Sequence, residues 1–188
     1  MKILVTGGAG FIGSHLVEEL LSNEHEILIF DNCLTGKKEN LEITGNFTFI
    51  NDDFGSENSL EVIEKFDPDI CFHLAAQSSV VVSVENPALD FEHNILQPIK
   101  LIQVLLKSNC KKFVFTSSGG TIFGELSVIP TAEEDYADEP ESPYGVAKKR
   151  LNELIKIMLK NSSMKYSILN LSNVYGPRQD PHGEAGVV

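Results

Sequence analysis

Two side chains with complementary acid–base chemistry lie four residues apart, in Tyr144-Gly145-Val146-Ala147-Lys148. On a helix, this spacing places both side chains on one face. A free tyrosine has a pKa of about 10, and a neighbouring ammonium group favours the phenolate. We therefore expect Lys148 to lower the pKa of Tyr144, so that the phenol works as an acid–base group near neutral pH. The segment Thr116-Ser117-Ser118 is expected to place a hydroxyl beside this tyrosine.

A second motif is the glycine-rich segment Gly7-Gly8-Ala9-Gly10-Phe11-Ile12-Gly13, which fits both GxGxxG and GxxGxxG. In such a strand-to-helix turn, one glycine permits the tight turn, one lets the backbone approach a pyrophosphate, and the last lets the helix pack closely on the strand. The N-terminus of the following helix offers unpaired N–H groups and a positive dipole end to the phosphates. The segment therefore predicts a dinucleotide site.

Asp31 lies 18 residues beyond Gly13, at the end of a second apolar run. This is close to the spacing of about 20 residues expected for the acid that accepts hydrogen bonds from the adenosine ribose. A carboxylate at this point repels a 2′-phosphate, so the pattern favours NAD over NADP. The alternative is a loop aspartate that only caps a turn.

Apolar runs alternate with helical patterns along the whole chain. Strands are expected over 3–6, 26–30, 47–50, 70–74, 112–116 and 166–171, and helices over about 11–21, 60–66, 87–107 and 143–160. This alternation predicts right-handed βαβ units and a parallel sheet covered on both faces. The fold class expected is α/β, a doubly wound, Rossmann-like parallel sheet in three α/β/α layers.

The composition is that of an ordinary globular protein, with 42% hydrophobic and 22% charged residues. The net charge of −12 argues against nucleic acid and anionic membranes as partners, and no apolar run approaches the roughly 18 residues of a membrane span. Cys33, Cys71 and Cys110 form no CxxC pair, which indicates reduced thiols in the cytoplasm, two of them packed as small apolar residues. The histidines show no metal-ligand spacing, so no metal site is expected.

Taken together, several segments resemble the extended short-chain dehydrogenase/reductase family, in the NAD-dependent nucleotide-sugar epimerase/dehydratase branch typified by UDP-glucose 4-epimerase. They occur in the family's order and spacing over essentially the whole chain. The matching segments are TGGAGFIGSHLV (6–17), FDN (30–32), DPDICFHLAAQSSV (67–80), Asn94, SSGGTIFGE (117–125), SPYGVAK (142–148) and SNVYGPRQDP (172–181).

The resemblance implies a role for each matching residue. Those implied to bind NAD are Gly7, Gly10, Phe11, Ile12 and Gly13 at the pyrophosphate, Asp31 and Asn32 at the adenosine ribose, Asp53 and Phe54 at the adenine, Leu74, Ala75 and Ala76 on the path to the nicotinamide ribose, and also Asn94, Ser117, Tyr144 and Lys148. Tyr144 is implied to be the base that removes the sugar hydroxyl proton, and Lys148 to bind the nicotinamide ribose and lower the pKa of that tyrosine. Ser118, Thr121 and Asn173 are implied to contact the substrate.

The sequence departs from the family pattern around Gly119-Gly120. Counting back from Gly124 places the family's catalytic hydroxyl on Gly119, so the assignment passes to a neighbour, Ser118 or Thr121, and we favour Ser118. Dehydratases of this branch carry an Asp-Glu pair here, and decarboxylases carry a Glu. Two glycines in this place favour epimerisation by analogy with the family. Phe123 and Asn170 also replace the family's usual tyrosine and arginine.

The resemblance implies a nucleotide-sugar epimerase that oxidises the sugar C4 hydroxyl to a keto group and returns hydride to the other face, with a UDP-hexose as the expected substrate. Dehydratase or reductase activity of the same branch, and a catalytically incompetent NAD-binding fragment, remain alternatives. Residues 1–188 are expected to form the NAD-binding domain, with the C-terminal substrate domain of the family largely absent. The two long helices, 87–107 and 143–160, carry enough apolar positions to allow a homodimer, although burial against the sheet explains the same pattern.

Overall fold

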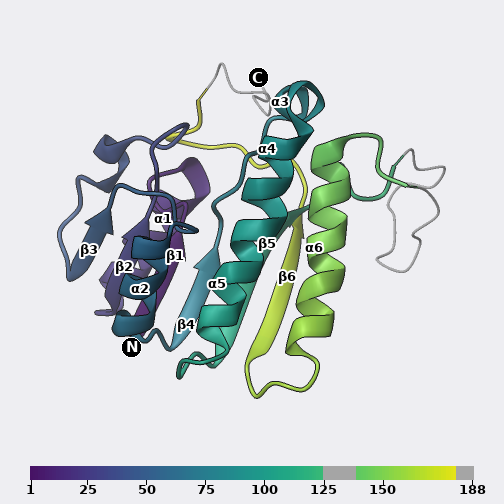
Figure 1. Ribbon diagram of the computed structural model, residues 1–188. Helices are drawn as coiled ribbons and strands as arrows, with labels where there is room; N and C mark the ends of the chain where they lie inside the picture. The colour runs from purple at the N-terminus through teal and green to yellow at the C-terminus, as the bar shows by residue number, and fades with distance from the viewer. Residues whose placement is uncertain (125–138, 181–188) are drawn as a thin grey trace.

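The computed structural model describes residues 1–124 and 139–180. Within them, six strands form one parallel sheet in the order β3-β2-β1-β4-β5-β6 (Figure 1). The strands are β1 (Lys2–Thr6), β2 (Glu26–Phe30), β3 (Phe47–Ile50), β4 (Ile70–His73), β5 (Lys112–Ser118) and β6 (Lys165–Leu171). All six predicted strands are present, and the doubly wound parallel fold is confirmed.

Helices cover both faces of this sheet, in three layers (Figure 1). They are α1 (Phe11–Ser22), the 3₁₀ turn η1 (Lys38–Leu41), α2 (Glu57–Phe66), α3 (Val80–Glu85), α4 (Pro87–Phe91), the π-helical segment η2 (Glu92–Leu96), α5 (Gln97–Leu105) and α6 (Pro143–Leu159). Successive side chains of a strand point to opposite faces, so β1 supplies both cores. Leu4 packs with α2, α5 and α6, whereas Ile3 and Val5 pack with α1.

The predicted helix over 87–107 is not a single regular α-helix. It consists of α4, the π-helical segment η2 and α5, and it ends at Leu105. The short helix α3, which the sequence did not predict, precedes it. Asn86 ends α3 and caps α4, because its side chain accepts a hydrogen bond from the Leu89 amide at 3.2 Å.

The strand order reverses at β1, which lies between β2 and β4. Thr6 is in register with Phe30 on one side and with His73 on the other, so these three strands end at the same edge. Ligands of open parallel sheets bind in the crevice beyond the carboxyl ends of the strands, at such a reversal point. The glycine segment, Asp31 and the segment 74–79 all begin there.

Cys33, Cys71 and Cys110 are free thiols, and the last two are buried as small core residues, as expected. Over the described ranges, no helix is long and apolar enough to cross a bilayer.

Candidate active site

The glycine segment forms a tight turn in which glycine is sterically required. A Cβ on Gly7, whose φ is +75°, would lie 2.6 Å from the Ala75 amide nitrogen, and one on Gly13 would lie 2.0 Å from the Gly7 carbonyl oxygen. These contacts bring β1, the segment after β4 and α1 together at the edge of the sheet. Gly10 differs, because a Cβ there would meet only the Gly7 carbonyl oxygen, at 3.3 Å. Gly10 is the N-cap of α1 and gives its first amides no side-chain acceptor.

The carboxylate of Asp31, at the end of β2, ties the turn to the neighbouring loop. Its Oδ2 accepts a hydrogen bond from the Ala9 amide at 2.9 Å, and its Oδ1 accepts one from the Cys33 amide at 2.9 Å. The side chain is buried, whereas Asn32 beside it is exposed. Asp31 therefore stabilises the glycine turn by hydrogen bonds. Its predicted hydrogen bonds to the adenosine ribose stay a prediction.

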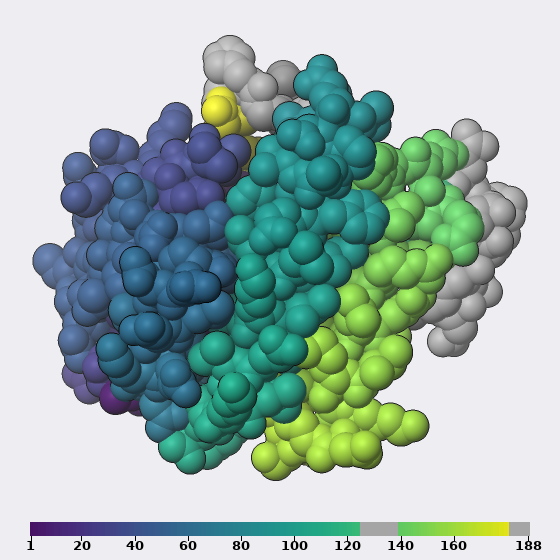
Figure 2. Space-filling model, in the orientation of Figure 1, coloured from purple at the N-terminus to yellow at the C-terminus, as the bar shows by residue number. Residues whose placement is uncertain are grey.

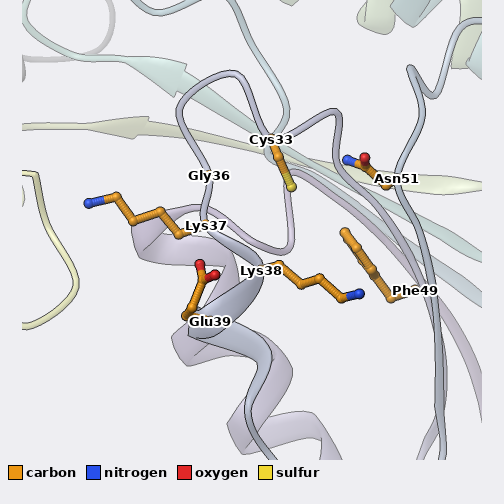
Figure 3. Close-up of a pocket in the computed structure, with 7 residues that line it drawn as sticks. All are labelled: Cys33, Gly36, Lys37, Lys38, Glu39, Phe49 and Asn51. Carbon is orange, nitrogen blue, oxygen red and sulfur yellow. The ribbon is translucent and has the colours of Figure 1, made fainter.

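A cavity of about 470 Å³ opens beside this loop, on the β2–β3 side of the site (Figure 3). The side chains of Cys33, Lys38 and Phe49 face the same space, while Lys37 extends away from it (Figure 3). The complete lining consists of Cys33, Gly36, Lys37, Lys38, Glu39, Phe49 and Asn51. No side chain of β5 or α6 reaches it, so the cavity belongs to the Asp31 end of the site.

Asp53 and Phe54 follow β3. Asp53 Oδ2 accepts a hydrogen bond from Gln97 Nε2 at 3.2 Å and lies 3.5 Å from His93 Nδ1. Phe54 is buried, with its ring against the His73 ring at 4.9 Å. The predicted adenine contacts are thus anchored by helices η2 and α5.

The acid–base residues meet where β5 ends against the first turns of α6. Ser118 is a side-chain hydrogen-bond partner of Tyr144 that lowers the pKa of the phenol. Lys148 Nζ donates to the Thr116 carbonyl oxygen at 3.1 Å and lies 5.8 Å from the centre of the Tyr144 ring. The structure therefore brings together the three residues that the sequence singled out for catalysis.

The pKa of Tyr144 contradicts the sequence-based expectation. Burial raises it, the Ser118 hydrogen bond lowers it in part, and the Asp90 charge also raises it, so that the pKa of Tyr144 is about 12. Burial also lowers the pKa of Lys148 to about 8, against the opposing effect of Asp90. In this chain, desolvation therefore outweighs the attraction between the ammonium and the phenolate, and Tyr144 holds its proton at neutral pH.

The remaining predicted residues lie around this pair. Leu74, Ala75 and Ala76 follow β4, and the buried Asn94 of η2 donates to the Gln77 carbonyl oxygen at 2.9 Å. Ser117 and Thr121 have hydroxyl oxygens that are buried without a hydrogen-bond partner. Of the two substrate hydroxyls considered, only Ser118 is bonded to Tyr144.

Asn173 lies beyond β6 on an exposed segment. This segment returns toward the N-terminus of α1: His15 Nε2 lies 3.0 Å from the Pro177 carbonyl oxygen, and Arg178 Nη2 lies 2.7 Å from Glu18 Oε2. Asn173 is thus at the same edge of the sheet as the glycine turn. Glu125 and Pro181, the last residues of the matching segments 117–125 and 172–181, lie outside the described part of the chain.

The model of the NAD dependent epimerase/dehydratase family matches residues 3–188. This chain belongs to that family. It is 39% identical over 191 residues to a UDP-glucose 4-epimerase of Mycolicibacterium smegmatis, with 100% of the chain and 61% of that protein covered.

Solved structures of the family have the same fold. A UDP-glucose 4-epimerase of Thermotoga maritima with UDP-glucose is 42% identical with a TM-score of 0.92, and one of Thermus thermophilus in complex with NAD is 43% identical with a TM-score of 0.90. Each match covers 99% of this chain and 60% of the solved chain. This member of the epimerase/dehydratase family therefore spans about 60% of the length of these relatives.

Two buried polar residues and one half-buried residue of this family member were missed from the sequence. Asp90 and His73 are almost fully buried and interact electrostatically with Lys148, and the half-buried Gln77 donates a hydrogen bond to Asp90. The signal for Asp90 was an acidic residue within a mostly apolar helical stretch. No group of three or more metal-ligating side chains is found in residues 1–124 and 139–180.

Proposed function

We propose that this chain is the NAD-binding portion of a nucleotide-sugar 4-epimerase that acts on a UDP-hexose. The observation that carries the proposal is the glycine turn at the strand-order reversal together with the Ser118, Tyr144 and Lys148 cluster at the same sheet edge. The family membership and the 4-epimerases among its relatives support it. The domain boundary proposed is 1–188 for the NAD-binding part, with the substrate domain elsewhere. Three free cysteines fit a cytoplasmic protein.

The residues present fit NAD. Gly10 leaves open space at the uncapped N-terminus of α1, where a pyrophosphate is stabilised by free amides and the helix dipole. Asp31 at the end of β2 keeps unused lone pairs for a ribose hydroxyl. The residues proposed to hold the cofactor are Gly7, Gly10, Phe11, Ile12, Gly13, Asp31, Asn32, Asp53, Phe54, Leu74, Ala75, Ala76, Asn94, Ser117, Tyr144 and Lys148.

Each acid–base residue has a proposed task. Bound NAD⁺ would supply the acceptor for the hydride that leaves C4 of the sugar. The ionised form of Tyr144, which requires prior loss of the phenol proton, takes the proton of the C4 hydroxyl and returns it when the sugar is reduced, while Ser118 orients the phenol as its hydrogen-bond partner. Lys148 brings positive charge beside the phenol and favours its ionisation. Ser118, Thr121 and Asn173 are proposed to contact the sugar nucleotide.

Dehydration and net reduction by the same branch are the second candidate. Water loss needs an acid and a base beside the sugar, and Gly119-Gly120 supplies neither directly after β5. Product analysis separates the candidates, because a dehydratase accumulates a 4-keto-6-deoxy sugar and a reductase consumes NADH and accumulates NAD⁺. An epimerase accumulates only the C4 epimer.

A homodimer through the face formed by α3, α4, η2 and α6 is part of the proposal. These helices lie side by side on one face (Figure 2), and they expose Val81, Val84, Leu89, Leu96 and Ile157. A surface of this kind typically marks a protein interface. Sedimentation of the wild type and of Ile157→Asp tests it, because the variant is expected to sediment as a monomer. A monomeric wild type would overturn this part.

The first test of the proposed function is calorimetric titration of the chain with NAD. Gly10→Val should abolish binding, because its side chain fills the space proposed for the pyrophosphate, while its Cβ meets only one protein atom, the Gly7 carbonyl oxygen at 3.3 Å. Gly120→Ala is the matched control, since a Cβ there meets nothing within 4 Å. Equal binding by wild type and Gly10→Val, or no binding by the wild type, would contradict the proposed site.

The second test is a steady-state assay with UDP-glucose and UDP-galactose. We propose that the 188-residue chain binds NAD but turns over poorly or not at all, because it covers only 60% of the length of the solved epimerases. Robust epimerisation by this chain would contradict that proposal. If turnover is found, Tyr144→Phe should remove it. In a catalytically incompetent NAD-binding module, this change would leave NAD binding unaffected.

A further inference from the structure

Asp90 is a fully buried acidic residue on α4, the helix that packs beside α6 (Figure 1). Its Oδ1 accepts hydrogen bonds from Gln77 Nε2 at 2.8 Å and from Asn94 Nδ2 at 2.9 Å. Its Oδ2 is buried without a hydrogen-bond partner. Burying a carboxylate is costly unless another charge compensates for it. We therefore expect a positive charge near Asp90.

The compensating charge is on α6. Lys148 is 3% exposed, and its ammonium group lies over the Phe115 ring at 4.7 Å with the Thr116 carbonyl oxygen as hydrogen-bond acceptor. One carbonyl and an aromatic face replace only part of the hydration of an ammonium. Burial raises the pKa of Asp90, and the Gln77 and Asn94 hydrogen bonds and the Lys148 charge act against this shift; Asp90 in turn raises the pKa of Lys148.

Gln77 and Asn94 fix the position of the Asp90 carboxylate. Gln77 Nε2 also donates to the Ser79 carbonyl oxygen at 2.9 Å, and Gln77 Oε1 accepts from the Ser79 amide at 2.6 Å. Asn94 bridges Asp90 Oδ1 and the Gln77 carbonyl oxygen with one amide group. The carboxylate is therefore held between α4, η2 and the segment that follows β4.

We propose that Asp90 is a positioning residue of the acid–base site, whose buried carboxylate is the counter-charge that keeps Lys148 protonated beside Tyr144. The inference rests on the proposed function in one respect, namely that the Lys148 charge assists the acid–base chemistry of Tyr144. It assigns Asp90 no contact with a substrate or cofactor.

The other titratable groups around Asp90 and Lys148 supply no negative charge to stabilise the Lys148 ammonium. Tyr144, on the same helix as Lys148, has a pKa of about 12 and is neutral at pH 7. His73, on β4, has a pKa of about 3 and is also neutral there. His93, on η2, lowers the pKa of Asp90 as Lys148 does. Asp90 is thus the negative group acting on Lys148, and removing its charge should make Lys148 lose its proton at lower pH.

The test is an NMR titration of the Lys148 side chain in the chain labelled with ¹³C-lysine, with Lys148→Met identifying the signal. Asp90→Asn retains an oxygen for the Gln77 and Asn94 donors and removes only the charge. We expect it to move the Lys148 midpoint down by about one pH unit. Glu85→Gln, an equal charge change at an exposed position on α3, should leave the midpoint in place. An unchanged midpoint in folded Asp90→Asn would overturn the proposal.

A second measurement needs no variant, in case Asp90→Asn does not fold. The ¹³Cγ shift of Asp90 in the wild type should be that of an ionised carboxylate at pH 7, with a small inflection where Lys148 titrates. A protonated Asp90 at pH 7 would overturn the proposal. Neither measurement uses NAD or a sugar nucleotide, so failure of the proposed function in the Gly10→Val titration is distinguishable from failure here.

Discussion

At the scale of single residues, burial governs the charge of the acid–base pair. Lys148 has a pKa of about 8 in the folded chain, against 10.5 for an ordinary lysine. Below pH 8 the folded state therefore holds a buried ammonium that the unfolded chain would hydrate. The cost is at most about 3.5 kcal/mol, since each pKa unit corresponds to about 1.4 kcal/mol. Residues kept for chemistry commonly carry such a cost.

Lys148→Met should therefore increase the free energy of unfolding at pH 7. Between pH 8 and 10.5 the unfolded wild type binds more protons than the folded form, so wild-type stability rises with pH and the advantage of the variant shrinks. The lost hydrogen bond to Thr116 reduces the gain without changing this trend. Urea unfolding at pH 7 and pH 10 measures both effects.

Lys156→Met, an exposed change on the same helix, is the control for this experiment. It should alter the free energy of unfolding by less than about 0.5 kcal/mol at either pH. An advantage of Lys148→Met that grows with pH would show that the ammonium is not destabilised by burial.

At the scale of the secondary-structure elements, the first turn of α6 holds Tyr144 in place. Ser142 is the N-cap of this helix, and its Oγ accepts a hydrogen bond from the Gly145 amide at 3.1 Å. Ser56 caps α2 in the same way, accepting from the Ser59 amide at 3.1 Å, far from the acid–base pair. The two serines therefore cap their helices alike, and Ser56 Oγ in addition donates a hydrogen bond to Asp52 Oδ2 at 2.9 Å.

Ser142→Ala and Ser56→Ala should each lower the free energy of unfolding by about 1 kcal/mol, because each leaves an orphan amide in a first turn. Only Ser142→Ala should accelerate hydrogen exchange of the Gly145 amide beside Tyr144. Urea unfolding and amide exchange measure the two effects. Unchanged Gly145 exchange in Ser142→Ala would mean that packing alone holds the start of α6.

The elements also show what could be predicted from the sequence. The strands were predictable because a sheet buried on both faces requires continuous apolar runs. The turn before α1 was predictable because Gly7 and Gly13 have contacts that admit no side chain. The βαβ alternation alone predicted that the carboxyl ends of the strands, and the turns that follow them, lie at one edge of the sheet.

The helix α3 was not predictable, because VVVSVE consists mainly of β-branched residues with poor helix propensity. Its end caps, Ser79 and Asn86, and its packing against α6 override that propensity. The pKa of Tyr144 was missed for a related reason. A four-residue spacing shows that a lysine is near, but the balance between its charge and desolvation depends on tertiary packing.

At the scale of the whole molecule, the stability of the fold depends on a neutral histidine at its centre. His73 stands between the Phe54, Phe113 and Phe115 rings, and its Nδ1 lies 2.7 Å from Thr6 Oγ1. Its Nε2 is buried without a hydrogen-bond partner. Burial, together with the Lys148 charge, lowers its pKa from 6.5 to about 3.

Because the unfolded chain binds a proton on this histidine below pH 6.5 and the folded chain does not, stability should fall as the pH decreases from 6.5 toward 3. Between pH 7 and pH 5 the loss should be about 2 kcal/mol. Carboxylates whose pKa values are lowered by hydrogen bonds, those of Asp52, Asp67 and Asp69, add their losses only as the pH falls below 3.8. Asp90, whose pKa is raised by burial, acts in the opposite direction. A comparison of the wild type with a variant that lacks the His73 imidazole therefore isolates the histidine.

His73→Asn keeps a polar atom near Thr6 and removes the titration. The variant should be less stable than the wild type at pH 7, because the smaller side chain leaves a cavity among the three rings. Its free energy of unfolding should nevertheless change little between pH 7 and pH 5, whereas that of His25→Asn, altered outside the core, should fall as in the wild type. Urea unfolding across this range measures the slopes. If His73→Asn fell as steeply as the wild type, acid sensitivity would have to come from groups other than the buried imidazole.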